Sequence, residues 1–71
     1  MTMGEFLVAL AAMNRRRPFQ PYVIEFDSGS QVKIMHPEVV VRQKELFAHL
    51  GNNGTSMIFS PYGVCRIVVK S

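Results

Sequence analysis

The sequence predicts a mainly β protein of the α+β class, in which an N-terminal helix precedes about five short antiparallel strands. An apolar stripe with helical spacing occupies residues 2–14. Short runs of alternating apolar and polar residues follow it, and Gly, Pro, Asn or Ser separates these runs. One helix and several short strands in 71 residues hide their edges best in a small, strongly bent barrel with the helix against it.

The first segment, residues 2–14, is predicted to be the helix. Thr2 and Glu5 have the spacing of a capping box, in which each side chain bonds the other residue's backbone amide. Pro18 disfavours helical backbone at the residue before it, so the helix should end near residue 14. Its apolar stripe consists of Met3, Phe6, Leu7, Leu10 and Met13.

A β-hairpin is predicted next. Pro18 and Pro21 hold the chain extended as it leaves the helix. Residues 22–27 and 31–36 alternate between apolar and polar side chains, as expected for strands with one buried face. The segment 27–30, Asp-Ser-Gly-Ser, has the composition of a tight turn between them.

The second half of the chain is predicted to supply the other strands. Pro37 should break or bulge the preceding strand, and residues 51–54 and 60–63 have the composition of a loop and a type I turn. The segment 39–42 is either a short strand or a bend, and residues 46–50 are either strand or helix, because they are good helix formers. The strands expected here span residues 39–42, 45–50, 56–60 and 64–70.

Chain length and cysteine content narrow the class of protein. A chain of 71 residues predicts a single domain, 1–71, whose small core gives marginal stability. Cys65 is the only cysteine, so no intrachain disulfide can form, and self-association is the expected source of added stability. A lone thiol fits a reducing cytoplasm. The longest apolar run, residues 6–13, is far too short to cross a bilayer, so we expect no membrane partner.

The net charge of +3 comes from one tripeptide, because without Arg15, Arg16 and Arg17 five basic residues balance five acidic ones. These arginines, with Phe19 and Tyr22 close behind, are candidate contacts for single-stranded RNA through phosphate binding and base stacking. Alternatively, the arginines lie at the negative carbonyl end of the helix, and the ring of Phe19 fills part of the core.

His36 and Glu38 flank a proline and form the most distinctive polar cluster. They could transfer protons or bind a metal, but a structural role in ordering a β-bend is favoured. The possible metal ligands also include His49 and Cys65, whose scattered spacing does not predict a zinc site. We expect no metal and no cofactor, and we expect Cys65 to be a small buried hydrophobic residue rather than a reactive thiol.

No sequence motif predicts catalysis: the chain contains no Gly-x-Ser-x-Gly, no glycine-rich phosphate loop and no paired carboxylates. The β-branched runs 39–41 and 67–69 show little polar alternation, which favours a strand that is covered on both faces or paired with another chain. The sequence therefore predicts a non-enzymatic binding or self-association module, with a homodimer or another protein as partner. The alternative is single-stranded RNA binding.

Two resemblances bear on the fold. Residues 18–29 and 32–38 resemble a group of short bacterial proteins of unknown function, whose pattern runs Pro-Phe-x-Pro-aromatic to Gly and then Val-x-His-Pro-Glu. This chain has Ser28 where the pattern has Asp, and the resemblance implies a shared fold without an activity. The order of a helix and bent strands is similar to Sm-like RNA-binding proteins and implies an SH3/Sm-like small barrel. The Sm-like step of Arg followed by Gly is missing, because Ile67 follows Arg66.

Overall fold

In the computed structural model, the helix α1 spans Met3–Asn14 and begins with the predicted capping box. The Thr2 hydroxyl accepts a hydrogen bond from the Glu5 amide at 3.1 Å, and Oε1 of Glu5 accepts one from the Thr2 amide at 2.9 Å. These bonds satisfy two backbone donors that the first turn of a helix leaves unpaired. The local sequence therefore determines where the helix starts.

The structure describes residues 1–51 and 56–70, without the side chains of Glu38 and Ser56. The predicted loop at 51–54 lies, except for its first residue, outside the described residues. Six strands follow the helix: β1 (Tyr22–Phe26), β2 (Gln31–Ile34), β3 (Val40–Gln43), β4 (Leu46–Leu50), β5 (Ser56–Phe59) and β6 (Val64–Val69).

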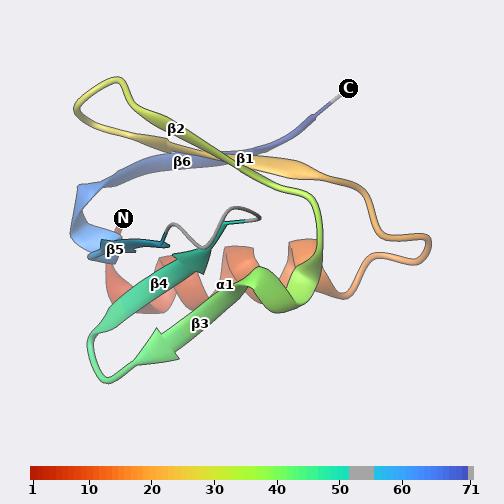
Figure 1. The fold of residues 1–71 in the computed structure, drawn as a ribbon, viewed down its shortest axis with the longest axis horizontal. Coiled ribbons are helices and arrows are strands. Elements are labelled where there is room, and N and C mark those ends of the chain that lie inside the picture. Colours follow the sequence, from red (N-terminus) through yellow and green to blue (C-terminus); the bar gives the residue numbers. More distant parts are fainter. Residues whose placement is uncertain (52–55, 71) are drawn as a thin grey trace.

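The strands form two antiparallel sheets of three, in the orders β2-β1-β6 and β3-β4-β5. Figure 1 shows the first sheet on one side of the molecule, with α1 and the second sheet on the other. The predicted mainly β, α+β class is confirmed. A closed barrel is not found, because among the described strands no pairing connects the two sheets.

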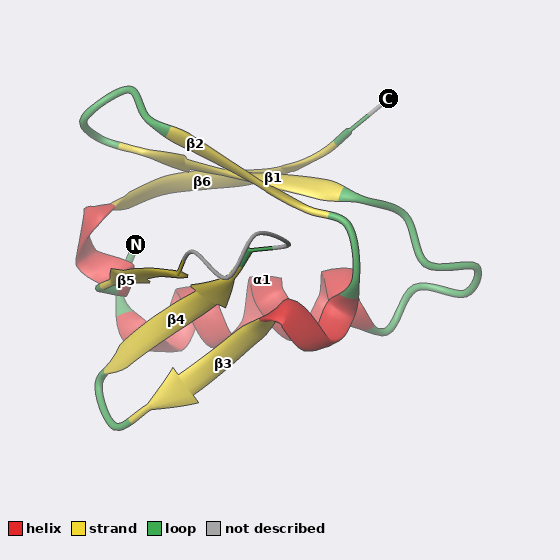
Figure 2. Ribbon diagram, viewed as in Figure 1, coloured by secondary structure: helices red, strands yellow, loops and turns green. Residues whose placement is uncertain are grey.

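Two short 3₁₀-helices explain this separation. The chain crosses between the sheets through η1 (Pro37–Val39), after β2, and through η2 (Pro61–Gly63), before β6 (Figure 2). Each begins with a proline, which has no amide to donate to a strand ladder. A bent strand that belonged to both sheets would need continuous pairing at these corners, and the 3₁₀ turns interrupt it.

The hairpin between β1 and β2 forms as predicted. The Phe26 amide donates to the carbonyl of Ser30 at 2.9 Å, and the Gly29 amide donates to the carbonyl of Phe26 at 2.9 Å. Gly29 has a φ of 94°, a backbone conformation that side chains disfavour. A glycine is therefore needed at this position of the turn.

The helical alternative for residues 46–50 is wrong, because this segment is β4, the central strand of its sheet. Its backbone pairs with β3 on one side and β5 on the other, which leaves no groups for helical hydrogen bonds. Side chains alternate along it: Phe47 is buried, whereas Leu46 and Leu50 are exposed.

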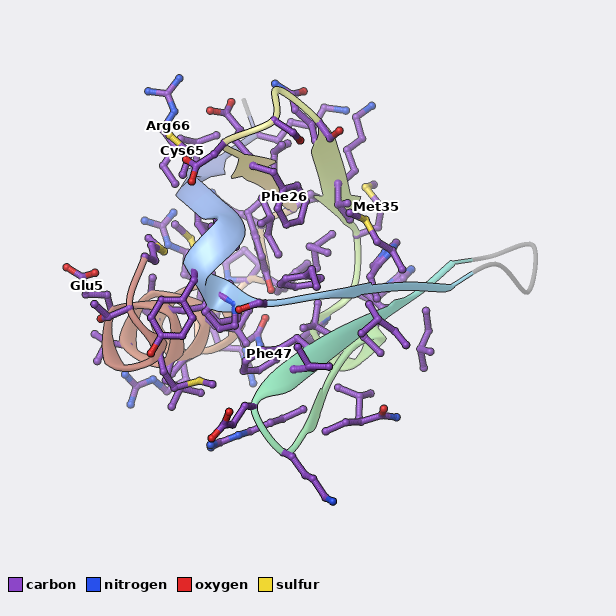
Figure 3. The ribbon with its side chains drawn as sticks, turned by 90° about the vertical axis from the view of Figure 1, so that its left-hand side faces the viewer. Glu5, Phe26, Met35, Phe47, Cys65 and Arg66 are labelled. Atoms are coloured by element: carbon purple, nitrogen blue, oxygen red, sulfur yellow. The ribbon has the colours of Figure 1, made fainter. Side chains whose placement is uncertain are left out.

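The core lies between the sheets, and α1 closes it. Phe6 of α1 contacts Phe47 of β4 and Phe59 of β5, with ring centroids 4.7 Å and 5.8 Å away, and Phe26 of β1 lies 5.2 Å from Phe59. Figure 3 shows Phe26 and Phe47 in this shared interior. The expected core residues are confirmed as buried: Phe6, Leu10, Ile24 and Ile34.

Candidate functional site

The outward face of the first sheet is polar around Glu25, while its next row places Val23 and Val68 beside Lys33. The strand register places Gln31, Glu25 and Arg66 in one row across β2, β1 and β6. The Glu25 carboxylate accepts hydrogen bonds from Nε of Arg66 and from Nε2 of Gln31, the latter at 3.3 Å. The hydrogen bond to Glu25, and then its charge, raise the pKa of Arg66. Charged and amide groups such as these are well solvated, so this part of the face can remain in contact with water.

The outward face of the second sheet is mainly apolar, although Gln43 lies on it beside Leu46. Val41 of β3, Ala48 of β4 and Ile58 of β5 form one row in the register. Leu46 and Leu50 lie on the same side of β4, two residues before and after Ala48. The four large side chains are 40–60% exposed, while Ala48, which lies between them in the register, is only 5% exposed. We call these five residues the outer apolar face.

This face arises because β4 and β5 carry apolar side chains on both sides. Phe47 and Phe59 point into the core, while their neighbours Ala48 and Ile58 point outward. Consecutive apolar residues in both strands were the sequence signal for it. The sequence analysis singled out the run 39–41 for association, and Val41 does lie on this face. The other run, residues 67–69, is half-buried on β6.

A pocket of about 210 Å³ opens where the chain leaves β2 and meets the end of β4. It brings together both histidines, because the register aligns His49 with Val40, the residue that follows η1, and His36 precedes η1. His36 is exposed and His49 half-buried. The residues that line the pocket include Lys33, Met35, His36, Val39, His49 and Leu50.

The arginine tripeptide is exposed, and parts of it are engaged locally. Arg17 donates from Nη1 to the carbonyls of Asn14 and Arg16, at 3.1 Å and 2.9 Å. Arg16 donates from Nη1 to Oε1 of Gln20 at 2.9 Å. The bond to Asn14 satisfies a carbonyl at the end of α1. Such a bond fits the alternative interpretation, in which the arginines interact with the negative carbonyl end of the helix.

The aromatic residues behind the tripeptide belong to the core. Tyr22 is buried, so its expected stacking on a nucleic-acid base is not possible in this conformation. Its hydroxyl donates to Oδ1 of Asn14 at 2.9 Å. Burial raises the pKa of Tyr22 to about 12, an effect that the bond to Asn14 partly offsets. Phe19 packs against the core and lies edge-on to Tyr22, with ring centroids 6.1 Å apart.

The predicted cluster of His36 and Glu38 lies at the start of η1. The side chain of His36 makes no capping hydrogen bond to this turn, and the bend-ordering role of the cluster stays a prediction. Of Glu38 only the backbone is described. Within residues 1–51 and 56–70, no three His, Cys, Asp or Glu side chains are grouped closely enough to hold a metal ion.

Cys65 is exposed, so the prediction of a buried residue is wrong. The cause is a β-bulge: Phe26 pairs with Val64, whereas the preceding residue of β1, Glu25, pairs with Arg66. Cys65 is therefore the extra residue of the bulge and points away from the core, which Val64 enters. Figure 3 shows Cys65 beside Arg66, well apart from Met35 of the histidine pocket.

Comparisons with protein-family models, with curated proteins and with solved structures give no match for this chain. In the described part of the chain, no helix has the length and apolar character needed to cross a membrane.

Proposed function

We propose that the chain is a non-enzymatic cytoplasmic module that associates with a second copy of itself through the outer apolar face. The observation that carries this proposal is the contrast between the two sheets. One outward face is solvated by Glu25, Gln31 and Arg66, whereas the other exposes Val41 and Ile58 beside two leucines. Contiguous exposed apolar side chains on a small protein are typical of an interaction site.

The composition of the face favours a second copy over a different partner. A two-fold axis requires that one patch be complementary to itself. When two copies pack face to face, an axis that runs parallel to β4 between them sets Ala48 against Ala48, and Val41 of each copy against Ile58 of the other. The described side chains pointing outward here carry no charge, so two copies can meet without repulsion.

The area of the outer apolar face limits the expected affinity of the dimer. Strands about 4.8 Å apart, with about 3.3 Å per residue, give three short strands a face of about 10 Å by 15 Å. Stable dimers bury about 800 Å² on each partner, which is much more than this face offers. We therefore expect a weak dimer whose population depends on concentration.

The small-barrel fold is part of the same proposal. We regard the two sheets as an opened form of an SH3/Sm-like barrel, in which η1 and η2 occupy the corners where strands would otherwise bend. The order of one helix and then antiparallel strands supports this relation. An opened barrel keeps a sheet face free for a partner, which links the fold to the association.

Sedimentation equilibrium from about 10 μM to about 1 mM tests the association, because weak dimers populate in this range. The wild-type average mass should rise from 8.0 kDa towards twice that value. Ile58→Lys should keep the protein monomeric throughout, because it puts a charge into the apolar interface. Val8→Lys is the matched control, since Val8 is 73% exposed on α1 and remote from the face. This control should dimerise like the wild type.

Two results would contradict the proposal. A wild-type protein that stays monomeric at the highest concentration has no such association. A dimer that persists unchanged in Ile58→Lys uses another surface.

A further inference from the structure

We propose that the pocket between β2, η1 and β4 binds a small organic carboxylate with an apolar tail. The carboxylate lies against Lys33, His36 and His49, and the tail lies among the apolar residues of the lining. This site is separate from self-association, although Leu50 borders both.

The polar part of the lining favours an anion. Lys33 and His36 come from the end of β2 and the residues after it, His49 comes from β4, and all three line one pocket. An ammonium group and imidazole N–H groups are hydrogen-bond donors to a carboxylate. Among the described residues of the lining, none is acidic.

A second lysine adds positive charge beside Lys33. Hydrogen bonding to Lys33, and then repulsion by its charge, lower the pKa of Lys70. The two ammonium groups therefore lie close together, and Lys33 also lines the pocket. A carboxylate relieves this repulsion, whereas a metal cation bound by the two histidines would increase it. The charge arrangement selects an anion over a metal.

The apolar residues of the lining favour a ligand with an apolar tail. Met35, Val39 and Leu50 present apolar side chains to the same space. The volume of about 210 Å³ is below the about 300–1,000 Å³ of sites for drug-sized ligands. A short carboxylic acid or the carboxyl end of a peptide chain is small enough to enter.

The pocket forms at η1, where the chain passes from the first sheet to the second. His36 has extended backbone, with φ −140° and ψ 144°, and Pro37 then starts η1. The turn brings the chain back beside β4, where Val40 pairs with His49. The same 3₁₀ corner that keeps the barrel open thus places the two histidines together.

Titration with sodium hexanoate, followed by ¹H–¹⁵N NMR in the presence of EDTA, tests the site. Saturable shifts should concentrate on the amides of His36, His49 and their neighbours. The double variant His36→Gln/His49→Gln should bind at least about tenfold more weakly, and Lys33→Gln several-fold more weakly, because each loses donors to the anion. Lys44→Gln, an exposed lysine in the turn after β3, is the matched control and should bind like the wild type.

Further titrations compare ligands that differ in the carboxylate, in the apolar tail, or in whether they are a small acid or a peptide. Hexanamide should bind far more weakly than hexanoate, and acetate should bind more weakly because it lacks the tail. A short peptide ending in leucine, compared with the same peptide carrying a C-terminal amide, shows whether the carboxyl end of a peptide chain also fits. Saturable binding of hexanoate or of the free-acid peptide supports the proposal. Equal binding of acids and amides, or no saturation by any acid, would overturn the proposal. So would zinc binding to the two histidines, measured in a separate titration without EDTA, if no acid binds. The variants are first checked for the wild-type NMR fold.

Discussion

Tyr22 shows how a single residue can join the helix to the first sheet. Its ring is buried in the core at the start of β1, and its hydroxyl donates to the side chain of Asn14, the last residue of α1. A buried hydroxyl without a partner would destabilise the fold, so this bond allows a polar atom at an otherwise apolar position.

The raised pKa of Tyr22, about 12, gives a prediction for alkaline stability. The unfolded chain loses this proton near pH 10, whereas the folded protein keeps it. The contribution of Tyr22 to the free energy of unfolding is therefore fully present below about pH 10. It is lost as pH rises towards about 12, which lowers the free energy of unfolding by up to about 2–3 kcal/mol. Urea denaturation at intervals between pH 9 and pH 12 measures this loss.

Tyr22→Phe is the control for this effect. It removes the titrating group and, with it, the bond to Asn14, so its stability should start about 1 kcal/mol lower and then fall less steeply with pH. Lysine and arginine titration affects both proteins alike, so the difference isolates Tyr22. Parallel curves for the two proteins would show that Tyr22 is not the cause.

At the scale of the element, the capping box of α1 gives the next prediction. Thr2→Ala should lower the free energy of unfolding by about 1 kcal/mol, because the Glu5 amide loses its acceptor. Thr2→Ser keeps the hydroxyl and should stay close to the wild type. Urea denaturation at neutral pH measures both variants, and equal stability of the alanine and serine variants would contradict a capping role for the hydroxyl.

The same box predicts a dependence on acid. Hydrogen bonds from the Thr2 backbone, and then from its side chain, lower the pKa of Glu5. A lowered carboxyl pKa contributes stability above the pKa of the unfolded chain, and this contribution is lost as pH falls through the folded value. Thr2→Ala keeps the backbone hydrogen bond and loses only the side-chain part of this contribution, so the difference in stability from the wild type should shrink in part between pH 7 and pH 2, as urea denaturation can show. A difference that is constant over this range would contradict the coupling.

At the scale of the whole molecule, the two sheets depend on a shared core because the described strands of one do not pair with those of the other. Phe6 contacts Phe47 and Phe59 of the second sheet, and Phe59 contacts Phe26 of the first. The helix and both sheets should therefore unfold as one cooperative unit.

Phe6→Ala tests this coupling. Loss of a buried ring costs about 3–5 kcal/mol, a large part of the about 4–11 kcal/mol expected for a chain of this length. We expect amide hydrogen exchange in β1 and in β4 to accelerate by similar factors. Val8→Ala on the exposed side of α1 should leave both rates nearly unchanged. Acceleration in β4 alone would show that the sheets unfold separately.

Local sequence determined the helix and the strands of this protein. Capping residues, prolines and the spacing of apolar side chains act within a few residues, and they set the backbone conformation and the buried side of each element. The start of α1 at Thr2 and the turn at Gly29 are of this kind. Val41 and His36 were also singled out from their local patterns, so part of each candidate site was visible in the sequence.

Only the tertiary structure decided which strands pair and which outward face is left apolar. The pairing of β1 with β6, the bulge that exposes Cys65, and the meeting of His36 with His49 all join residues distant in the chain. Such contacts depend on how the elements pack as a whole and on the entropy of closing the loops between them. Periodicity shows that a strand has two apolar sides, but it cannot show which side the core will cover, because the partners that compete for each side are specified elsewhere in the chain.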